Sequence, residues 1–475
     1  METKRLLPLM AAALLAASAC GGATTQSGNR QFQLRGRSMT PCTLTRGVSA
    51  LCGVLRVPED PSNRAGRSID LQVAVNPAVA KSGIQQPVFF VAGGPGDSAI
   101  QSWAQAASIF PMLDTHHDIV LVDQRGTGGS NEMLVPPIGP AESTAAYAKR
   151  VLAGLSGDPR YYTTSIAMDD LDAVRAALGY SSIDLYGGSY GATAVQYYLR
   201  QHADRVHLAV LDGGTLLDVP IFELFPASSQ RALDGVLTRC RSDAPCNTAF
   251  PDPSGELTAV LARLTANPGP STVLDTNGRP TVVTADFLAG TIHGRLLSAS
   301  SAATIPWLIH RAAVGDFDAV VKEGTQPSTA TRMMALEILC SEAWARFDPA
   351  AVATAGAGSY LLASELSAAQ NQAQTCPMVP PGVVPSGDAL PVSSQVPVLL
   401  LNGENDPQDP PANVAEAQQQ MPNSVRIVAR AQGHTVGNLG CLPAVVVAYF
   451  DTGKVDQAVA KACAQSLPLV PFKLT

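Results

Sequence analysis

Three residues that lie far apart in the chain have the types and the order of a hydrolytic triad. Ser189 lies in the segment Gly-Gly-Ser-Tyr-Gly, Asp406 comes much later, and His434 follows it. A serine hydroxyl is a poor nucleophile at neutral pH, so it needs a base within hydrogen-bond reach and a third group that orients the base. We therefore predict Ser189 as the nucleophile, His434 as the base and Asp406 as the acid.

The surroundings of Ser189 fit a turn that exposes a nucleophile. Glycines flank the serine, a short predicted strand at residues 183–186 precedes it, and a helical pattern at residues 192–202 follows it. Strand, sharp turn and helix are the context in which Gly-x-Ser-x-Gly presents its serine above a parallel sheet. An ordinary glycine-rich turn is the alternative interpretation of this segment.

The acid and the base are assigned by their places after apolar runs. Asp406 follows the run at residues 396–401, and His434 follows the run at residues 424–428. Glu404 and Asp409 are nearby carboxylates that stay open as alternatives for the acid. The other six histidines are expected on the surface or in packing roles: His116, His117, His202, His207, His293 and His310.

Backbone N–H groups near Ser189 could stabilise the oxyanion of an acyl-transfer reaction. One donor is the N–H of Tyr190, directly after the nucleophile, and the other comes from the turn Gly93-Gly94-Pro95-Gly96. Glycines let the backbone approach a substrate closely, and preorganised donors of this kind lower the barrier by a few kcal/mol. We predict Gly94 and Tyr190 as the oxyanion hole, with a plain tight loop as the alternative for the glycine turn.

The elements that must position these residues follow an alternating strand and helix pattern. Apolar runs at residues 87–91, 119–122 and 206–211 join those named above, and helical spacing over residues 166–178 ends at Gly179. This pattern predicts an α/β fold with a mostly parallel sheet between helices. We expect residues 38–475 to form three segments. The first part of the core is at residues 38–216, a mainly helical cap insertion above the carboxyl ends of the strands is at 217–390, and the rest of the core is at 391–475.

The N-terminus has the features of an export signal. Lys4 and Arg5 precede an apolar run that is too short to span a bilayer, which predicts a signal peptide over residues 1–20. Small residues before Cys20 resemble a lipobox, so we expect lipidation at Cys20 and a flexible tether over residues 21–37. Ala17 departs from the usual leucine of that box, which leaves ordinary signal-peptide cleavage and secretion as the alternative. The expected location is extracytoplasmic, at a membrane of the periplasm or cell surface.

The cysteine count agrees with export. Nine cysteines are present, and removing Cys20 leaves eight that fall into local couples, as expected for thiols in an oxidising compartment. The expected disulfides are Cys42 with Cys52, Cys240 with Cys246, Cys340 with Cys376, and Cys441 with Cys463. No CxxC pair or HExxH helix is present, so we expect no metal and no organic cofactor. A net charge of −7 gives no indication of nucleic-acid binding.

Four segments together resemble the proline iminopeptidase and tripeptidyl aminopeptidase (TAP-like) group of the α/β-hydrolases. They are Gly93-Gly94-Pro95-Gly96, Asp123-Gln124-Arg125-Gly126-Thr127-Gly128, Gly187-Gly188-Ser189-Tyr190-Gly191, and Asp406-Pro407 followed by Gly433-His434. The resemblance implies the α/β-hydrolase fold and release of residues from the free N-terminus of peptides. It also implies a cap carboxylate for the substrate ammonium, with Glu342 as first choice and Glu337 as second. Solvated helix-face charges are the alternative for both glutamates.

Departures from this group affect specificity and leave the triad intact. Ala92 stands where many iminopeptidases have a histidine, and Pro407-Gln408-Asp409-Pro410 differs from the usual segment after the acid. We expect Arg125 to form a structural ion pair. The leading functional prediction is an exported aminopeptidase that works through an acyl-enzyme and acts on peptides with a free N-terminus. An esterase of small acyl substrates is the enzyme alternative, and a non-catalytic surface lipoprotein that binds ligands is the alternative of another class.

Overall fold

The fold is known from a computed structural model, which describes residues 31–475 apart from 81–82, 108–109, 111, 138–141, 276–277 and 325–330. The expected signal peptide, Cys20 and residues 21–30 of the expected tether lie outside the described residues. The end of that tether is folded: β1 (Gln33–Leu34) pairs with β2 (Arg37–Ser38), and Leu34 is buried in the core. The folded body therefore begins before residue 38, because Leu34 packs against the hydrolase core.

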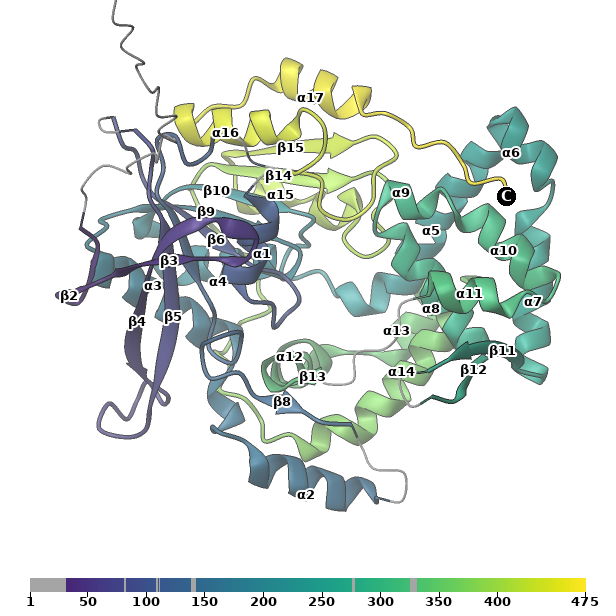
Figure 1. Ribbon diagram of the computed structural model, residues 1–475, viewed down its shortest axis with the longest axis horizontal. Helices are drawn as coiled ribbons and strands as arrows, with labels where there is room; N and C mark the ends of the chain where they lie inside the picture. Colours follow the sequence, from purple (N-terminus) through teal and green to yellow (C-terminus); the bar gives the residue numbers. More distant parts are fainter. Residues whose placement is uncertain are drawn as a thin grey trace, which may run out of the picture.

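A nine-stranded sheet organises the described part of the chain (Figure 1), in the order β15-β14-β10-β9-β6-β7-β5-β4-β3. Neighbours from β15 to β7 are parallel, and those from β7 to β3 are antiparallel. The parallel strands are β6 (Val88–Val91), β7 (Ile119–Val122), β9 (Ile183–Gly188), β10 (Val206–Asp212), β14 (Val398–Gly403) and β15 (Ser424–Ala429). The others are β3 (Thr40–Thr43), β4 (Ser49–Pro58) and β5 (Ser68–Asn76). This is the mixed, mostly parallel sheet of the predicted fold.

Helices cover both faces of the sheet, which explains the continuous apolar runs in its parallel strands. Val120 and Val122 of β7 face one buried cluster, whereas Ile119 and Leu121 face the other. Since side chains alternate along a strand, a strand covered on both faces is apolar at most positions. The helices of the core are α1 (Ala99–Ala106), α2 (Thr144–Gly154), α3 (Thr164–Leu178), α4 (Tyr190–His202), α15 (Ala417–Gln420), α16 (Leu442–Thr452) and α17 (Gln457–Ser466). Gly179 caps α3 in the left-handed conformation, as expected.

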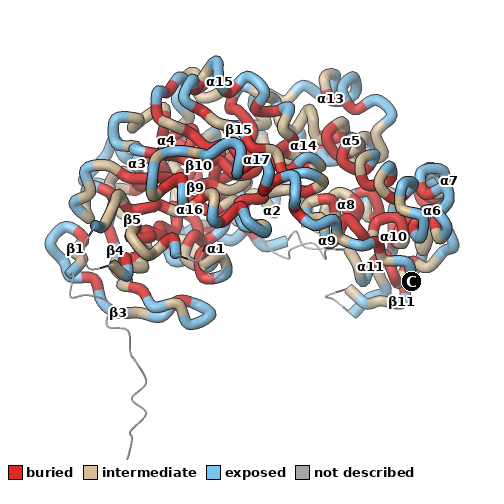
Figure 2. The backbone as a smooth tube through the Cα atoms, turned by 90° about the horizontal axis from the view of Figure 1, so that it is seen from above, coloured by how far each residue is buried: buried red, intermediate tan, exposed pale blue. Residues whose placement is uncertain are grey.

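Most of the insertion between β10 and β14 forms a second helical body. Its helices are α5 (Ile221–Ser242), α6 (Ala244–Ala249), α7 (Pro253–Ala266), α8 (Ala285–Leu296), α9 (Ala299–Ala302), α10 (Ile305–Ala313) and α11 (Phe317–Glu323), with a hairpin of β11 (Gly269–Leu274) and β12 (Pro280–Val283). These elements enclose their own apolar cluster. Figure 2 shows the two buried regions, one along the sheet and one within these helices. The cap therefore has its own hydrophobic core.

The last part of the insertion contacts both bodies. Its α12 (Met333–Ile338) lies against the hydrolase core, where β13 (Thr331–Arg332) pairs with β8 (Leu134–Val135), whereas α13 (Pro349–Ala355) and α14 (Leu362–Thr375) pack against α5 and α8 of the cap. Met333, Met334 and Ile338 belong to the core cluster under α3 and α4, separate from the cap cluster. Thus α12 lies beside the glycine turn, since a Cβ on Gly96 would lie 3.7 Å from Cβ of Ala335.

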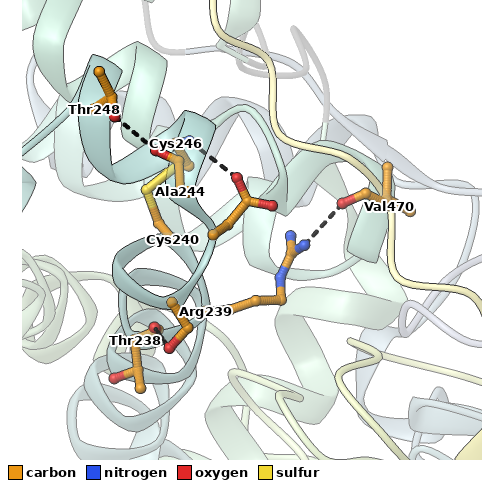
Figure 3. Close-up of a disulfide and its surroundings, with 9 residues drawn as sticks. Thr238, Arg239, Cys240, Ala244, Cys246, Thr248 and Val470 are labelled. Atoms are coloured by element: carbon orange, nitrogen blue, oxygen red, sulfur yellow. Dashed lines mark hydrogen bonds between the residues drawn. A yellow bond between two sulfur atoms is a disulfide. The ribbon is translucent and has the colours of Figure 1, made fainter.

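The C-terminal segment crosses from the core to the cap (Figure 1). Arg239 of α5 donates to the carbonyl oxygen of Val470 at 2.8 Å (Figure 3), and its guanidinium lies 3.7 Å from the ring centroid of Phe472. Phe472 is buried in the cap cluster, and the N–H of Lys473 donates to the carbonyl of Ala303. This segment therefore holds the cap against the core.

Disulfides join the four expected pairs, which are Cys42–Cys52, Cys240–Cys246, Cys340–Cys376 and Cys441–Cys463. Cys240–Cys246 links the neighbouring helices α5 and α6 (Figure 3), whereas Cys340–Cys376 spans 36 residues, which include α13 and α14. Disulfides form and persist in oxidising compartments, so they indicate an extracytoplasmic protein. Within the described ranges, no helix is both long and apolar enough to cross a membrane.

Arg125 forms the expected structural ion pair. Its guanidinium donates to both carboxylate oxygens of Asp170 on α3, at 2.7 and 3.0 Å, and also to the carbonyl oxygens of Glu59 and Tyr161. Both side chains of the pair are buried. The loop after β7 is thereby fixed to α3 and to the end of β4.

Arg125→Met should lower the free energy of unfolding by about 3 to 5 kcal/mol, because it leaves the buried Asp170 carboxylate without its partner. Urea denaturation followed by circular dichroism measures the loss. The exposed Arg64 provides the control, since Arg64→Gln should change the same quantity by less than about 0.5 kcal/mol. Equal losses in the two variants would contradict a structural role for the ion pair.

Candidate active site

Ser189 occupies a strained turn between β9 and α4. Its backbone has φ +57° and ψ −128°, a conformation that residues other than glycine rarely adopt. A Cβ on Gly187 would lie 2.2 Å from the carbonyl oxygen of Gly191, and one on Gly191 would lie 2.3 Å from that of Val91. Both glycines are therefore required sterically, because the turn packs backbone against backbone.

Asp406 and His434 meet at the carboxyl edge of the sheet. The imidazole Nδ1 of His434 lies 2.8 Å from Oδ2 of Asp406, which is fully buried. The other oxygen, Oδ1, accepts from the backbone N–H groups of Gln408 at 3.0 Å and Asp409 at 2.9 Å. These bonds orient the carboxylate, so Nδ1 of His434 carries the proton that it donates and Nε2 is left as the acceptor.

The two other carboxylates near this loop have different roles. Asp409 Oδ2 lies 3.6 Å from Nδ1 of His434, and its Oδ1 accepts from Thr215 Oγ1 at 2.6 Å. Glu404 accepts from the backbone N–H of Ala431 at 2.8 Å. Of the three candidates for the acid, Asp406 has the hydrogen bond to the imidazole, and Asp409 is a second carboxylate beside it.

Asp212, at the end of β10, positions both the nucleophile and the base. Its backbone carbonyl accepts from the N–H of Ser189 at 2.9 Å. Its carboxylate accepts from the N–H groups of Val436 at 2.7 Å and Gly437 at 2.9 Å, which lie two and three residues after His434. The sequence analysis did not identify Asp212. The available signal was an acidic residue at the end of an apolar strand, beside the strand that carries the nucleophile.

The glycine turn lies beside the nucleophile. A Cβ on Gly93 would lie 3.2 Å from Cβ of Ser189, and Gly94 has φ +107°. Tyr190 is the first residue of α4, where backbone N–H groups have no acceptor within the helix. The predicted oxyanion donors, Gly94 and Tyr190, thus lie on the two segments that border Ser189.

Asp123 of the Asp-Gln-Arg-Gly segment supports the glycine turn. Its Oδ1 accepts from Ser98 Oγ at 2.6 Å and from the N–H of Ile100, and its Oδ2 accepts from the N–H of Gly129. Ser98 caps α1, which follows the turn directly. The Asp-Gln-Arg-Gly segment and the segment that follows the glycine turn are therefore joined directly by hydrogen bonds.

The two glutamates expected to bind the substrate amine are both buried. Glu342 accepts from the backbone N–H and the hydroxyl of Thr164, each at 2.7 Å, and Thr164 Oγ1 is 2.9 Å from the hydroxyl of Tyr190. Glu337 accepts from Ser341 at 2.5 Å, and its Oε2 has no hydrogen-bond partner among the described residues. Burial raises the pKa of each carboxyl to about 7. Neither is the solvated helix-face charge of the alternative interpretation.

The cap contacts both the acid loop and the base loop. Arg231 of α5 donates to the carbonyl oxygens of Glu404 and Asp406, and the N–H of His434 donates to the carbonyl of Leu297 at 2.8 Å. Cap position and triad geometry are therefore linked by direct hydrogen bonds.

Nε2 of His434 has a neighbour that the sequence did not predict. The side-chain amide nitrogen of Gln408 lies 3.1 Å from Nε2, and among the described residues no hydrogen bond joins Ser189 Oγ to His434. The base nitrogen is thus hydrogen-bonded to an amide in this state.

Asp406, Asp409 and His434 are also the one group of described residues whose ligand atoms lie close enough together to hold a metal ion. These atoms already serve other bonds: Nδ1 of His434 bonds Asp406, and Thr215 bonds Asp409. The three side chains lie close together because these hydrogen bonds orient the imidazole of His434.

Two family models match the chain. Residues 86–268 match a model described as alpha/beta hydrolase fold, and residues 363–463 match one described as TAP-like protein. The first covers the strands that carry the glycine turn and Ser189, and the second covers the loops of Asp406 and His434. The chain therefore has the α/β-hydrolase fold with a TAP-like C-terminal part.

Curated relatives are distant. Serine protease Hip1 of Mycobacterium tuberculosis is 28% identical over 207 residues, covering 37% of this chain and 38% of Hip1. Tripeptidyl aminopeptidase of Streptomyces coelicolor is 27% identical over 187 residues, covering 34% of each. The chain thus matches well under half the length of these relatives. Among solved structures, an alpha/beta hydrolase fold protein from Chitinophaga pinensis is 14% identical, with a TM-score of 0.39 over 85% of this chain and 97% of that chain.

The environment of His434 predicts an alkaline rise in activity. Burial lowers the pKa of His434, but attraction to the carboxylates of Asp406, Asp409 and Asp212 outweighs burial and raises it to about 9. A general base must be unprotonated, so kcat/KM should rise with pH up to about 9. Asp409→Asn removes one attracting charge and should move this rise to lower pH in the pH–rate profile. A profile that does not move in Asp409→Asn would contradict the electrostatic role of this carboxylate.

Proposed function

We propose that this chain, an α/β-hydrolase with a TAP-like C-terminal part, is an exported serine aminopeptidase that releases N-terminal residues or short peptides. The observation that carries the proposal is the 2.8 Å hydrogen bond between Asp406 and His434, at the sheet edge where Asp212 also binds the backbone of Ser189. These groups have the roles of acid, base and nucleophile in acyl transfer.

The reaction begins when Oγ of Ser189 attacks the carbonyl carbon of the scissile peptide bond. His434 Nε2 takes the hydroxyl proton, and the imidazolium is stabilised by Asp406. The N–H groups of Tyr190 and Gly94 stabilise the tetrahedral oxyanion. His434 then protonates the leaving amine, and the N-terminal part of the peptide stays as an ester on Ser189. Water activated by His434 hydrolyses the ester and restores the enzyme.

A buried carboxylate recognises the substrate ammonium in this proposal. Glu342 is the first choice, because Thr164 links it to Tyr190, the residue after the nucleophile. Glu337 is the second, and its unpartnered Oε2 has capacity to accept from an ammonium. An ammonium beside either carboxylate would offset the burial that raises its pKa.

The names of the relatives and the disulfides support the peptidase and export parts of the proposal. One relative is named a serine protease and the other a tripeptidyl aminopeptidase. Four disulfides fit an extracytoplasmic enzyme. We further propose that acylation of Cys20 anchors the protein to a membrane.

Two alternatives have distinct experimental signatures. The same serine turn and oxyanion donors serve esters as well as amides, so an esterase of small acyl substrates would hydrolyse p-nitrophenyl esters in preference to peptides. A binding module would retain the fold without turnover of either class.

Blocking the N-terminus of a peptide substrate separates these functions. Tripeptidyl and aminoacyl p-nitroanilides with a free amine should be hydrolysed, and their N-acetylated forms should lose at least about tenfold in kcat/KM, because a lost ammonium leaves a buried carboxylate unpaired. Release of p-nitroaniline measures the rates. The matching p-nitrophenyl acetate assay is the control for an intact triad. Equal rates on free and acetylated peptides would refute the aminopeptidase.

A further inference from the structure

Three polar side chains form a hydrogen-bonded row in the cap. His293 of α8 lies 3.0 Å through Nδ1 from the hydroxyl of Ser229 on α5, and this hydroxyl lies 2.5 Å from that of Tyr360. Ser229 is buried, whereas His293 and Tyr360 are partly buried. The sequence analysis expected a surface or packing role for His293, whereas the structure places it in this polar row.

Gln408 contacts the catalytic base. Its amide nitrogen is 3.1 Å from Nε2 of His434. In the unprotonated form of His434, which is the form that acts as a base, Nδ1 donates to Asp406 and Nε2 accepts, so the Gln408 nitrogen is the donor of this bond.

This contact competes with activation of the nucleophile. The Nε2 lone pair lies in the plane of the ring and accepts one short hydrogen bond, either from the hydroxyl of Ser189 or from the amide of Gln408. General-base catalysis requires the first arrangement, because the base must be within hydrogen-bond reach of the proton that it takes. The second arrangement leaves Ser189 without its base.

We propose that the side chain of Gln408 blocks the catalytic base in the substrate-free enzyme, and that substrate entry between cap and core displaces it. This inference rests on the proposed function, since it requires His434 to act as the base for Ser189. The Gln408 side chain is the moving part. Its backbone N–H stays bound to Asp406, and so the acid keeps its orientation when the side chain leaves.

Removing the side chain tests the competition with a probe that needs no cap contacts. A small fluorophosphonate should label Gln408→Ala about three to ten times faster than the wild type, the factor expected from losing one neutral hydrogen bond. With free peptides, the same variant should show a lower KM and nearly unchanged kcat, because displacement no longer opposes binding. Gln419→Ala, at an exposed glutamine of α15, is the matched control and should label at the wild-type rate.

Labelling of the wild-type protein distinguishes a failure of the blocking role of Gln408 from a failure of the proposed hydrolase function. A thermal melt verifies that Gln408→Ala is folded. If the wild type is labelled and the folded variant is labelled at an equal or slower rate, the blocking role of Gln408 is wrong and the hydrolase proposal stands. Gln408→Leu provides a second variant, because a side chain of similar size that cannot hydrogen-bond Nε2 of His434 should also speed labelling, by about twofold or more. Wild-type protein that stays unlabelled would overturn the proposed function and this inference with it.

Discussion

Asp212 binds two loops that must meet, and the arrangement of the site depends on these bonds. β10 lies between β9 and β14, and the register pairs Asp212 with Gly188 on one side and Leu401 on the other. Its carbonyl fixes the turn of Ser189, and its carboxylate fixes the loop of His434 through two backbone N–H groups. Because Asp212 is fully buried, these donors and the hydroxyl of Tyr186 replace the water that its carboxylate loses.

The cap is part of the same arrangement. Leu297 accepts from the backbone of His434, and Arg231 donates to the loop of Asp406. The C-terminal segment binds the cap through Arg239 and Phe472. A displacement of the cap therefore changes the environment of the base as well as the entrance for substrate. These hydrogen bonds link substrate binding under the cap to the environment of His434.

The sequence predicted those features of the fold that depend on residues close together in the chain. The turn around Ser189 requires glycines within two residues, the parallel strands are buried on both faces, and the disulfides join cysteines close in the chain, so each leaves a readable pattern. Asp212 and Gln408 act through partners that are distant in the chain, and no pattern in their own segments indicates those partners. The antiparallel strands β3 to β5 were missed because they lack the continuous apolar runs of buried strands. The return of α12 to the core was missed because its apolar residues fit either body.

The central claim is that these contacts make one serine of the chain reactive. The most direct measurement is mass-spectrometric mapping of the adduct formed with a fluorophosphonate at pH 9, where His434 is substantially unprotonated. The account predicts one adduct per chain, on Ser189, and no adduct in His434→Gln over the same time. An adduct on another serine, or equal labelling of Ser189 without His434, would contradict it.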